Sequence, residues 1–345
     1  MSHFNNKLIG VICGLVLSCT ALAADPVALN PSHPERYTVV KGDTLWDISA
    51  MFLRDPWLWP EIWYVNPQVE NPHLIYPGDE LVLTYLDGRP ILRVNRKNKL
   101  SPRIRATPLD QAIPTIPIDA IEPFLTRPYV VDEHELDSAP YIIHFLDDHI
   151  VGGGGISYYA RSIMDDDYKQ YAIVRPGKPY KDPDTNDILG YEAQYIGSSE
   201  LRRTGDPAKL FINSSEMEAL IGDRLIHTEE EEPLIDFQPK VPDGDIEGRI
   251  IAVLNGVSQI GQYNVVVLNK GANVGLEPGH VLEILQGGNE VRDIIKGRGE
   301  TVTLPLEKAG MLMVFRTFEK VSFALVMDAT KPLHVLDWVR PPATR

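Results

Sequence analysis

The sequence has little cysteine and few long apolar runs. Its 345 residues include two cysteines, Cys13 and Cys19, and both lie close to the start of the chain. An apolar run there, residues 8–17, follows Lys7 and precedes the small-residue series 21–23, which predicts an export signal cleaved near Ala23. Cleavage at that point would leave no cysteine. Disulfides, thiol catalysis and thiolate metal sites are then excluded.

No later stretch approaches the ~20 consecutive apolar residues that a transmembrane helix needs. We therefore expect no transmembrane helix, and a protein that is periplasmic or associated with the cell envelope. One alternative stays open, because Val16-Leu17-Ser18-Cys19 resembles a lipoprotein cleavage box. In that case Cys19 would be acylated and would anchor the chain to a membrane.

Positive charge is also scarce. The chain has 33 basic and 48 acidic residues, and removal of the signal would take away one lysine and no acid. Nucleic-acid binding needs clustered Lys and Arg, so nucleic acid is excluded as a partner. The acidity itself needs no explanation beyond solubility.

Recognisable catalytic motifs are missing as well. The histidines beyond the signal form no H-x-H or H-E-x-x-H pattern, and neither G-x-S-x-G nor S-x-x-K occurs. The one local cluster of possible metal ligands, His144 to His149, is better explained as a solvent-exposed loop. We expect no catalytic residues, no metal and no cofactor. With 48 acidic residues, a carboxylate pair of the kind that cleaves glycosidic bonds stays open.

What the chain does contain is an ordered pattern between residues 36 and 85. A short β-type run, residues 37–40, precedes a turn at Lys41-Gly42-Asp43. Asp43 or Thr44 can cap a helix, and apolar residues at helical spacing follow up to Phe52. A second helical run is rich in tryptophan and stops before a proline. A loop then leads into a last strand from Glu80, giving the order strand, helix, helix, strand.

This stretch resembles a LysM module, the small βααβ domain that binds N-acetylglucosamine-containing glycans such as peptidoglycan. The similarity rests on residues 37–39, 42–48, 66–67 and 74–81, in the family's order and near its spacing. It departs from the family over Arg54–Trp63, which is more aromatic than usual.

The resemblance implies a shallow glycan groove between two loops. Its predicted glycan-binding residues are Gly42, Asp43, Thr44, Leu45, Asn71, Pro72, His73, Leu74 and Ile75. Backbone N–H and C=O groups there can pair with an acetamido group while leucine and isoleucine cover its methyl. The alternative is that Gly42 and Asp43 only form the turn and cap the helix, and that His73 is merely exposed.

The tryptophans of the second helical run cannot share one helix face. Trp59 and Trp63 are spaced i, i+4 and are expected in the module's core. Trp57 then points elsewhere. We therefore expect this helix, and Trp57 in particular, to pack against the chain that follows.

The rest of the chain is mainly β in character, so the predicted fold class is α+β: a βααβ module followed by small barrel-like or sandwich-like domains. Two β segments echo each other, which suggests a duplicated unit. In that echo four runs match: those from Tyr171, Gly190, Ala208 and Gly222 match, in order, those from Tyr263, Gly310, Phe323 and Leu336. Asp223 then matches Asp337. The predicted divisions are 1–23 signal, 24–35 tether, 36–85 LysM module, 86–128 proline-rich connector, 129–226 β domain, 227–245 acidic linker and 246–341 β domain.

Two functions are consistent with these features. The first is a non-catalytic, exported peptidoglycan-binding protein whose β domains engage an unknown partner, for which an envelope protein is the candidate. The second is a cell-wall hydrolase with an unrecognised active site in the β region.

Overall fold

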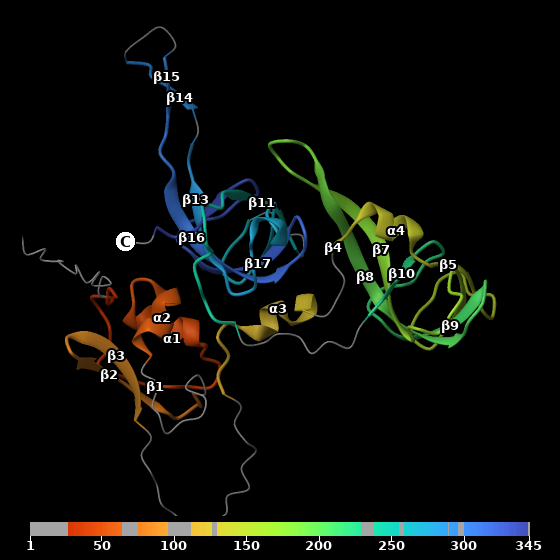
Figure 1. Cartoon of the computed structure of the whole chain (residues 1–345), viewed down its shortest axis with the longest axis horizontal. Helices are drawn as coiled ribbons and strands as arrows, with labels where there is room; N and C mark the ends of the chain where they lie inside the picture. The colour runs from red at the N-terminus through yellow and green to blue at the C-terminus, as the bar shows by residue number, and fades with distance from the viewer. Residues whose placement is uncertain are drawn as a thin grey trace, which may run out of the picture.

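The computed structural model describes residues 27–63, 75–95, 112–125, 130–228, 237–254, 259–288, 290–295 and 300–343. These residues form an N-terminal α+β module and two β domains (Figure 1). This confirms the predicted fold class. No helix in the described ranges is long and apolar enough to cross a membrane.

The N-terminal module packs two short helices on an antiparallel sheet. Its elements are β1 (Arg36–Thr38), α1 (Leu45–Phe52), the 3₁₀ helix η1 (Pro56–Leu58), α2 (Trp59–Ile62), β2 (Glu80–Leu86) and β3 (Arg89–Asn95). The sheet order is β1-β2-β3. The third strand, β3, pairs along the whole of β2 and so extends the sheet into the range predicted as connector.

The first β domain follows a connecting helix, α3 (Ile118–Leu125). It contains β4 (Val130–Val131), α4 (Glu133–Ser138), β5 (Tyr141–Phe145), β6 (Ser157–Arg161), β7 (Gln170–Lys181), β8 (Ile188–Arg203), β9 (Ala208–Ser215) and β10 (Arg224–His227). Neighbours in the sheet run β8-β7-β10-β5-β6-β9, and a further pairing of β9 with β8 joins the two ends.

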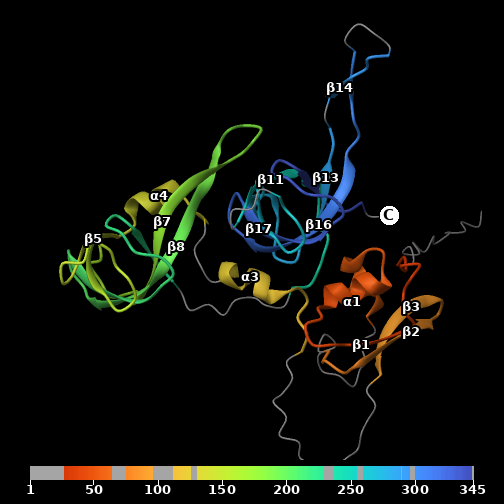
Figure 2. The same cartoon turned by 180° about the vertical axis from the view of Figure 1, so that it is seen from behind.

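The second β domain is a closed barrel with the order β11-β12-β17-β16-β13-β18. Its strands are β11 (Gly248–Val253), β12 (Val265–Leu268), β13 (Val281–Gln286), β16 (Glu307–Thr317), β17 (Ser322–Ala329) and β18 (Trp338–Arg340); η2 (Ala272–Val274) is a short 3₁₀ turn. Strands β14 (Glu290–Arg292) and β15 (Thr301–Thr303) form a separate two-stranded ribbon between β13 and β16, which projects away from the barrel (Figures 1 and 2).

The two β domains share one topology. If the six ring strands of each domain are numbered along the chain, both rings read 1-2-5-4-3-6. The predicted echo is therefore a true structural duplication. Three of its four strand correspondences are right, but Tyr171 lies on the third strand of its ring whereas Tyr263 precedes the second, so that pairing is wrong.

A repeated corner before the last strand supports the duplication. In the first domain Asp223 accepts a hydrogen bond from Leu220 N–H (2.8 Å), and its own carbonyl pairs with Ile142 N–H. In the second, Asp337 accepts from His334 N–H (2.8 Å), and its carbonyl pairs with Ile250 N–H. The two aspartates that the echo matched, Asp223 and Asp337, thus lie in the same turn of their domains.

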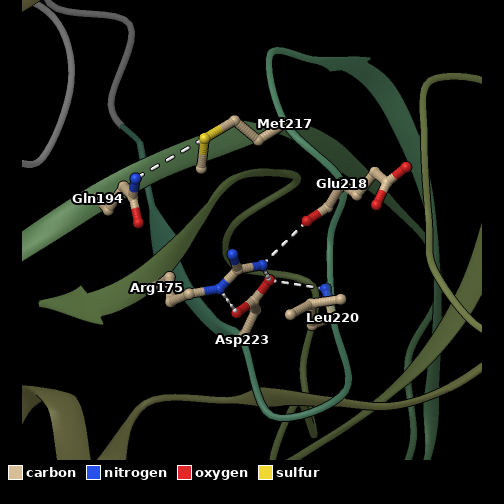
Figure 3. A network of polar contacts seen from close by, with 6 residues as sticks. All are labelled: Arg175, Gln194, Met217, Glu218, Leu220 and Asp223. Carbon is tan, nitrogen blue, oxygen red and sulfur yellow. Dashed lines mark hydrogen bonds and ion pairs between the residues drawn. The ribbon is translucent and has the colours of Figure 1, made fainter.

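The third strand of each domain contributes a side chain to this corner. Arg175 donates to both carboxylate oxygens of Asp223 at 2.9 Å, and also to Glu218 O (Figure 3). In the second domain the equivalent donor is the amide of Gln286, 2.8 Å from Asp337. The duplicated corner is therefore charged in one domain and carries a neutral donor in the other.

The second β domain lies between the N-terminal module and the first β domain (Figures 1 and 2). One hydrophobic cluster joins all three: it contains Trp46 and Trp57 of the module, Ile121 and Phe124 of α3, Tyr180 of β7 and barrel side chains such as Phe323. The order of the bodies in space is thus different from their order along the chain.

Candidate functional site

The candidate groove begins at the first turn of α1. Thr44 is the N-cap of this helix: its Oγ1 accepts from Asp47 N–H at 3.1 Å and donates to Asp47 Oδ2 at 2.8 Å. Such a reciprocal cap satisfies helix donors that have no partner within the helix. Of the two predicted caps, Thr44 holds the position.

Asp43 organises the turn before the helix. Its Oδ2 accepts from Val40 N–H (2.9 Å) and from the Tyr37 hydroxyl (3.0 Å). Burial raises the pKa of Tyr37, and the Asp43 carboxylate adds to that rise. Gly42 has a φ of 99°, a left-handed conformation that favours glycine. The structure therefore gives Asp43 and Gly42 turn-forming roles.

Two other predicted residues are apolar and inside. Leu45 is 3% exposed and Ile75 is fully buried, and both belong to the module's core cluster. Each side of the predicted groove therefore contributes one apolar residue to its floor. The remaining predicted residues, Asn71, Pro72, His73 and Leu74, lie outside the described residues.

A short piece of the chain itself lies between these two sides. We call residues 113–116 the inserted segment. Leu45 N–H donates to Pro114 O at 2.9 Å and Trp46 N–H donates to Thr115 O at 3.1 Å; on the other side, Ile113 N–H donates to Ile75 O at 2.8 Å. The sequence predicted a proline-rich connector here, but not that it would enter the groove.

The tryptophans divide as predicted. Trp59 and Trp63 pack edge to face in the module's core, with ring centroids 6.2 Å apart. Trp57 lies instead in the cluster shared with the second β domain, and Lys308 of β16 lies 5.1 Å from its ring centre. The 3₁₀ helix η1, which carries Trp57, therefore packs against the downstream chain, whereas α2 packs within the module.

A polar contact reinforces this junction. The Tyr263 hydroxyl donates to Asp47 Oδ1 at 2.8 Å, so one carboxylate both completes the α1 cap and binds the barrel. Burial raises the pKa of Tyr263, and the bond to Asp47 raises it further. A recess at this junction is lined by Trp46, Asp47, Arg54, Trp57, Lys308 and Asp328, among others.

The chemistry of the site is that of binding through main-chain groups and apolar contact. Within the described ranges, no group of three or more His, Cys, Asp or Glu side chains is placed to hold a metal ion. The groove combines helix N–H donors, the Ile75 carbonyl and an apolar floor, a composition typical of sites for small neutral ligands.

The order of elements and the groove at the start of α1 are those of a small glycan-binding module. A family model described as "LysM domain" matches residues 37–84, so the chain carries a LysM domain there, the module class that binds peptidoglycan and related glycans. The chain is also similar to "Uncharacterized protein YqbP" of Bacillus subtilis (strain 168), with 42% identity over 62 residues. That similarity covers 15% of this chain and 28% of YqbP, so it concerns a segment of each protein.

Proposed function

We propose that this protein is an exported, non-catalytic peptidoglycan-binding protein of the periplasm or cell envelope. Its LysM domain holds N-acetylglucosamine-containing wall glycan, and its β domains engage another envelope protein. The observation that carries the proposal is the LysM match at residues 37–84, together with a groove whose backbone groups and apolar floor suit an acetamido sugar.

The wall-binding part is tested by sedimentation with insoluble peptidoglycan. We expect the whole chain to sediment with the wall and a chain lacking residues 36–95 to stay in solution. The deletion includes β3 because this strand pairs along β2. The double variant Asn71→Ala/His73→Ala tests the groove by itself, because it leaves in place the surface of the module that packs against the barrel. Equal retention of the whole and the shortened chain would refute wall binding through the module.

Zymography on wall material tests the non-catalytic part. We expect no cleared band from the purified whole chain. A cleared band would favour the alternative, a wall hydrolase with its active site in the β region, and would refute the non-catalytic assignment.

The ribbon β14–β15 supports the proposed protein partner. It projects from the barrel (Figure 1), and its exposed apolar side chains include Val291, Ile294, Ile295 and Val302, with Ile294 82% and Ile295 88% exposed. A two-stranded ribbon also offers unpaired main-chain edges to which another strand can add. We propose that a β-rich envelope protein docks on this ribbon.

Photo-crosslinking in cells tests that assignment. A crosslinking residue in place of Ile294 should capture one distinct protein, and Ile295→Ser should reduce its yield severalfold. The same residue in place of Ile150, which is 87% exposed on the first β domain, is the matched control. Capture only of a second copy of this chain would refute a hetero-partner at the ribbon.

A further inference from the structure

The glycan groove of the LysM domain is already occupied by the chain itself. The inserted segment, residues 113–116, uses Leu45 N–H, Trp46 N–H and Ile75 O, the main-chain groups on the two sides of the groove. We propose that this segment is an intramolecular competitor of the glycan, so that wall binding requires its displacement. The inference rests on the proposed function and adds a regulation of that same site.

The segment presents the same set of groups as an acetamido sugar. Its Pro114 carbonyl accepts from the helix terminus, its Ile113 N–H donates to the opposite carbonyl, and its Ile113 side chain is 6% exposed within the module's core cluster. An acetamido group also offers one carbonyl, one N–H and one small apolar group. Segment and sugar would therefore compete for the same donors, acceptor and floor.

The helix donors cannot serve both occupants at once. Leu45 and Trp46 are the first two residues of α1, whose N–H groups have no partner within the helix. Each is bonded to the inserted segment at 2.9 or 3.1 Å. A glycan that binds there must break these bonds.

The segment is held at its other end by the second β domain. Ile116, directly after the groove contacts, is fully buried in the cluster that joins module and barrel. Further along, Arg316 of β16 donates to Phe124 O of α3 at 2.9 Å. Because both ends of this stretch are packed, the segment acts at the effective concentration of an intramolecular ligand.

The size of the affinity change depends on the fraction of molecules in which the inserted segment occupies the groove. If the open groove is populated one time in ten, the apparent Kd for glycan is about ten times the intrinsic Kd. Loosening the segment should recover that factor without any new contact to the sugar.

Calorimetry with a soluble N-acetylglucosamine hexamer tests the competition. Ile113→Gly/Pro114→Gly removes the apolar plug and the stiff backbone, and we expect its affinity to rise about tenfold. The matched control is Pro117→Gly/Ile118→Gly, which makes the same exchange just beyond the groove, where Ile118 packs towards the barrel. The control should bind like the unaltered chain.

Amide hydrogen exchange supplies a readout that needs no glycan. In the Ile113→Gly/Pro114→Gly variant the amides of Leu45 and Trp46 should exchange at least tenfold faster. The amide of Ile48, which bonds to Thr44 O within the module, should keep its protection and so show that the module is folded.

The outcomes separate the two proposals. Equal hexamer affinity of the unaltered chain and the variant overturns the competition but leaves wall binding intact. An equal rise in the control variant also overturns it, because the effect would then come from loosened domain contacts. If neither protein binds the hexamer or the wall, the proposed function fails, and the competition fails with it.

Discussion

At the scale of single residues, His280 shows how the second β domain depends on an uncharged side chain. It is 5% exposed, and its Nδ1 accepts from Glu277 N–H at 3.0 Å, which requires an unprotonated nitrogen. Burial lowers its pKa, and nearby Lys240 lowers it further, against smaller opposing effects of Glu277 and Asp243. The folded state therefore holds this histidine neutral.

The first prediction is a stability change below neutral pH. Above a pH of about 6.5 the imidazole is neutral in both states and its contribution is fully present. As the pH falls below that value, the unfolded state binds the proton first, so the free energy of unfolding decreases until the folded pKa is reached. The free energy of unfolding of the barrel, measured by amide exchange on β17 at pH 7.5 and at pH 5.5, should show this loss.

His280→Asn is the control for that loss, because it keeps an acceptor for Glu277 N–H and does not titrate in this range. The variant should lose less stability than the unaltered chain between the two pH values. Equal losses would assign the pH dependence to other groups.

Residue roles near the module were only partly readable from the sequence. Cap chemistry narrowed the helix start to Asp43 or Thr44, and spacing separated Trp57 from Trp59 and Trp63, because both follow from local geometry. The Asp47–Tyr263 bond could not be foreseen, since the two residues are 216 positions apart. No local pattern encodes such a contact.

At the scale of elements, β strands were well predicted where apolar residues cluster between turn signals. The observed β5 (Tyr141–Phe145) and β6 (Ser157–Arg161) coincide with two apolar-rich runs that flank the four glycines at 152–155. The ribbon β14–β15 escaped prediction because its apolar residues are exposed and no buried face imposes a clean alternation. The inserted segment escaped for a different reason: its bonds run to Leu45, Trp46 and Ile75, far away in the sequence.

The duplicated corner gives the second prediction. The Asp223 side chain is 4% exposed and carries a charge-assisted, two-pronged bond to Arg175, whereas Asp337 meets the neutral Gln286. Loss of a buried partner of a charge costs more than loss of a neutral hydrogen bond. Asp223→Ala should therefore destabilise the first domain by about 3 kcal/mol, and Asp337→Ala the second by about 1 kcal/mol.

Two probes separate these effects. The stability of the first β domain is read from amide exchange on β7, and that of the second from amide exchange on β17. Arg175→Gln, which makes the first corner resemble the second, should fall between the two alanine variants in cost. Equal costs for both aspartates would contradict the assigned difference.

At the scale of the whole molecule, the N-terminal module and the second β domain behave as one body. They share a hydrophobic cluster that contains Trp46, Trp57 and side chains of α3, and a hydrogen bond through Tyr263. Sequence analysis anticipated that the module docks, but not that it docks on the domain most distant along the chain.

The third prediction concerns cooperative unfolding. Because buried aromatic area dominates such junctions, the module and the second β domain should unfold in one calorimetric transition. Trp57→Ala removes an 8%-exposed ring from the shared cluster, and large-to-small changes of this kind cost about 3 kcal/mol. The variant should therefore show a separate, earlier transition for the module.

Ile294→Ser, on the exposed ribbon, is the control and should leave the joint transition unchanged. Amide exchange follows the two bodies separately, on α1 for the module and on β17 for the barrel. Separate module and barrel transitions in the unaltered chain would contradict the shared body. Coupling of this kind matters for the groove, because Ile116, which directly follows the groove contacts of the inserted segment, lies in the same shared cluster as Trp57.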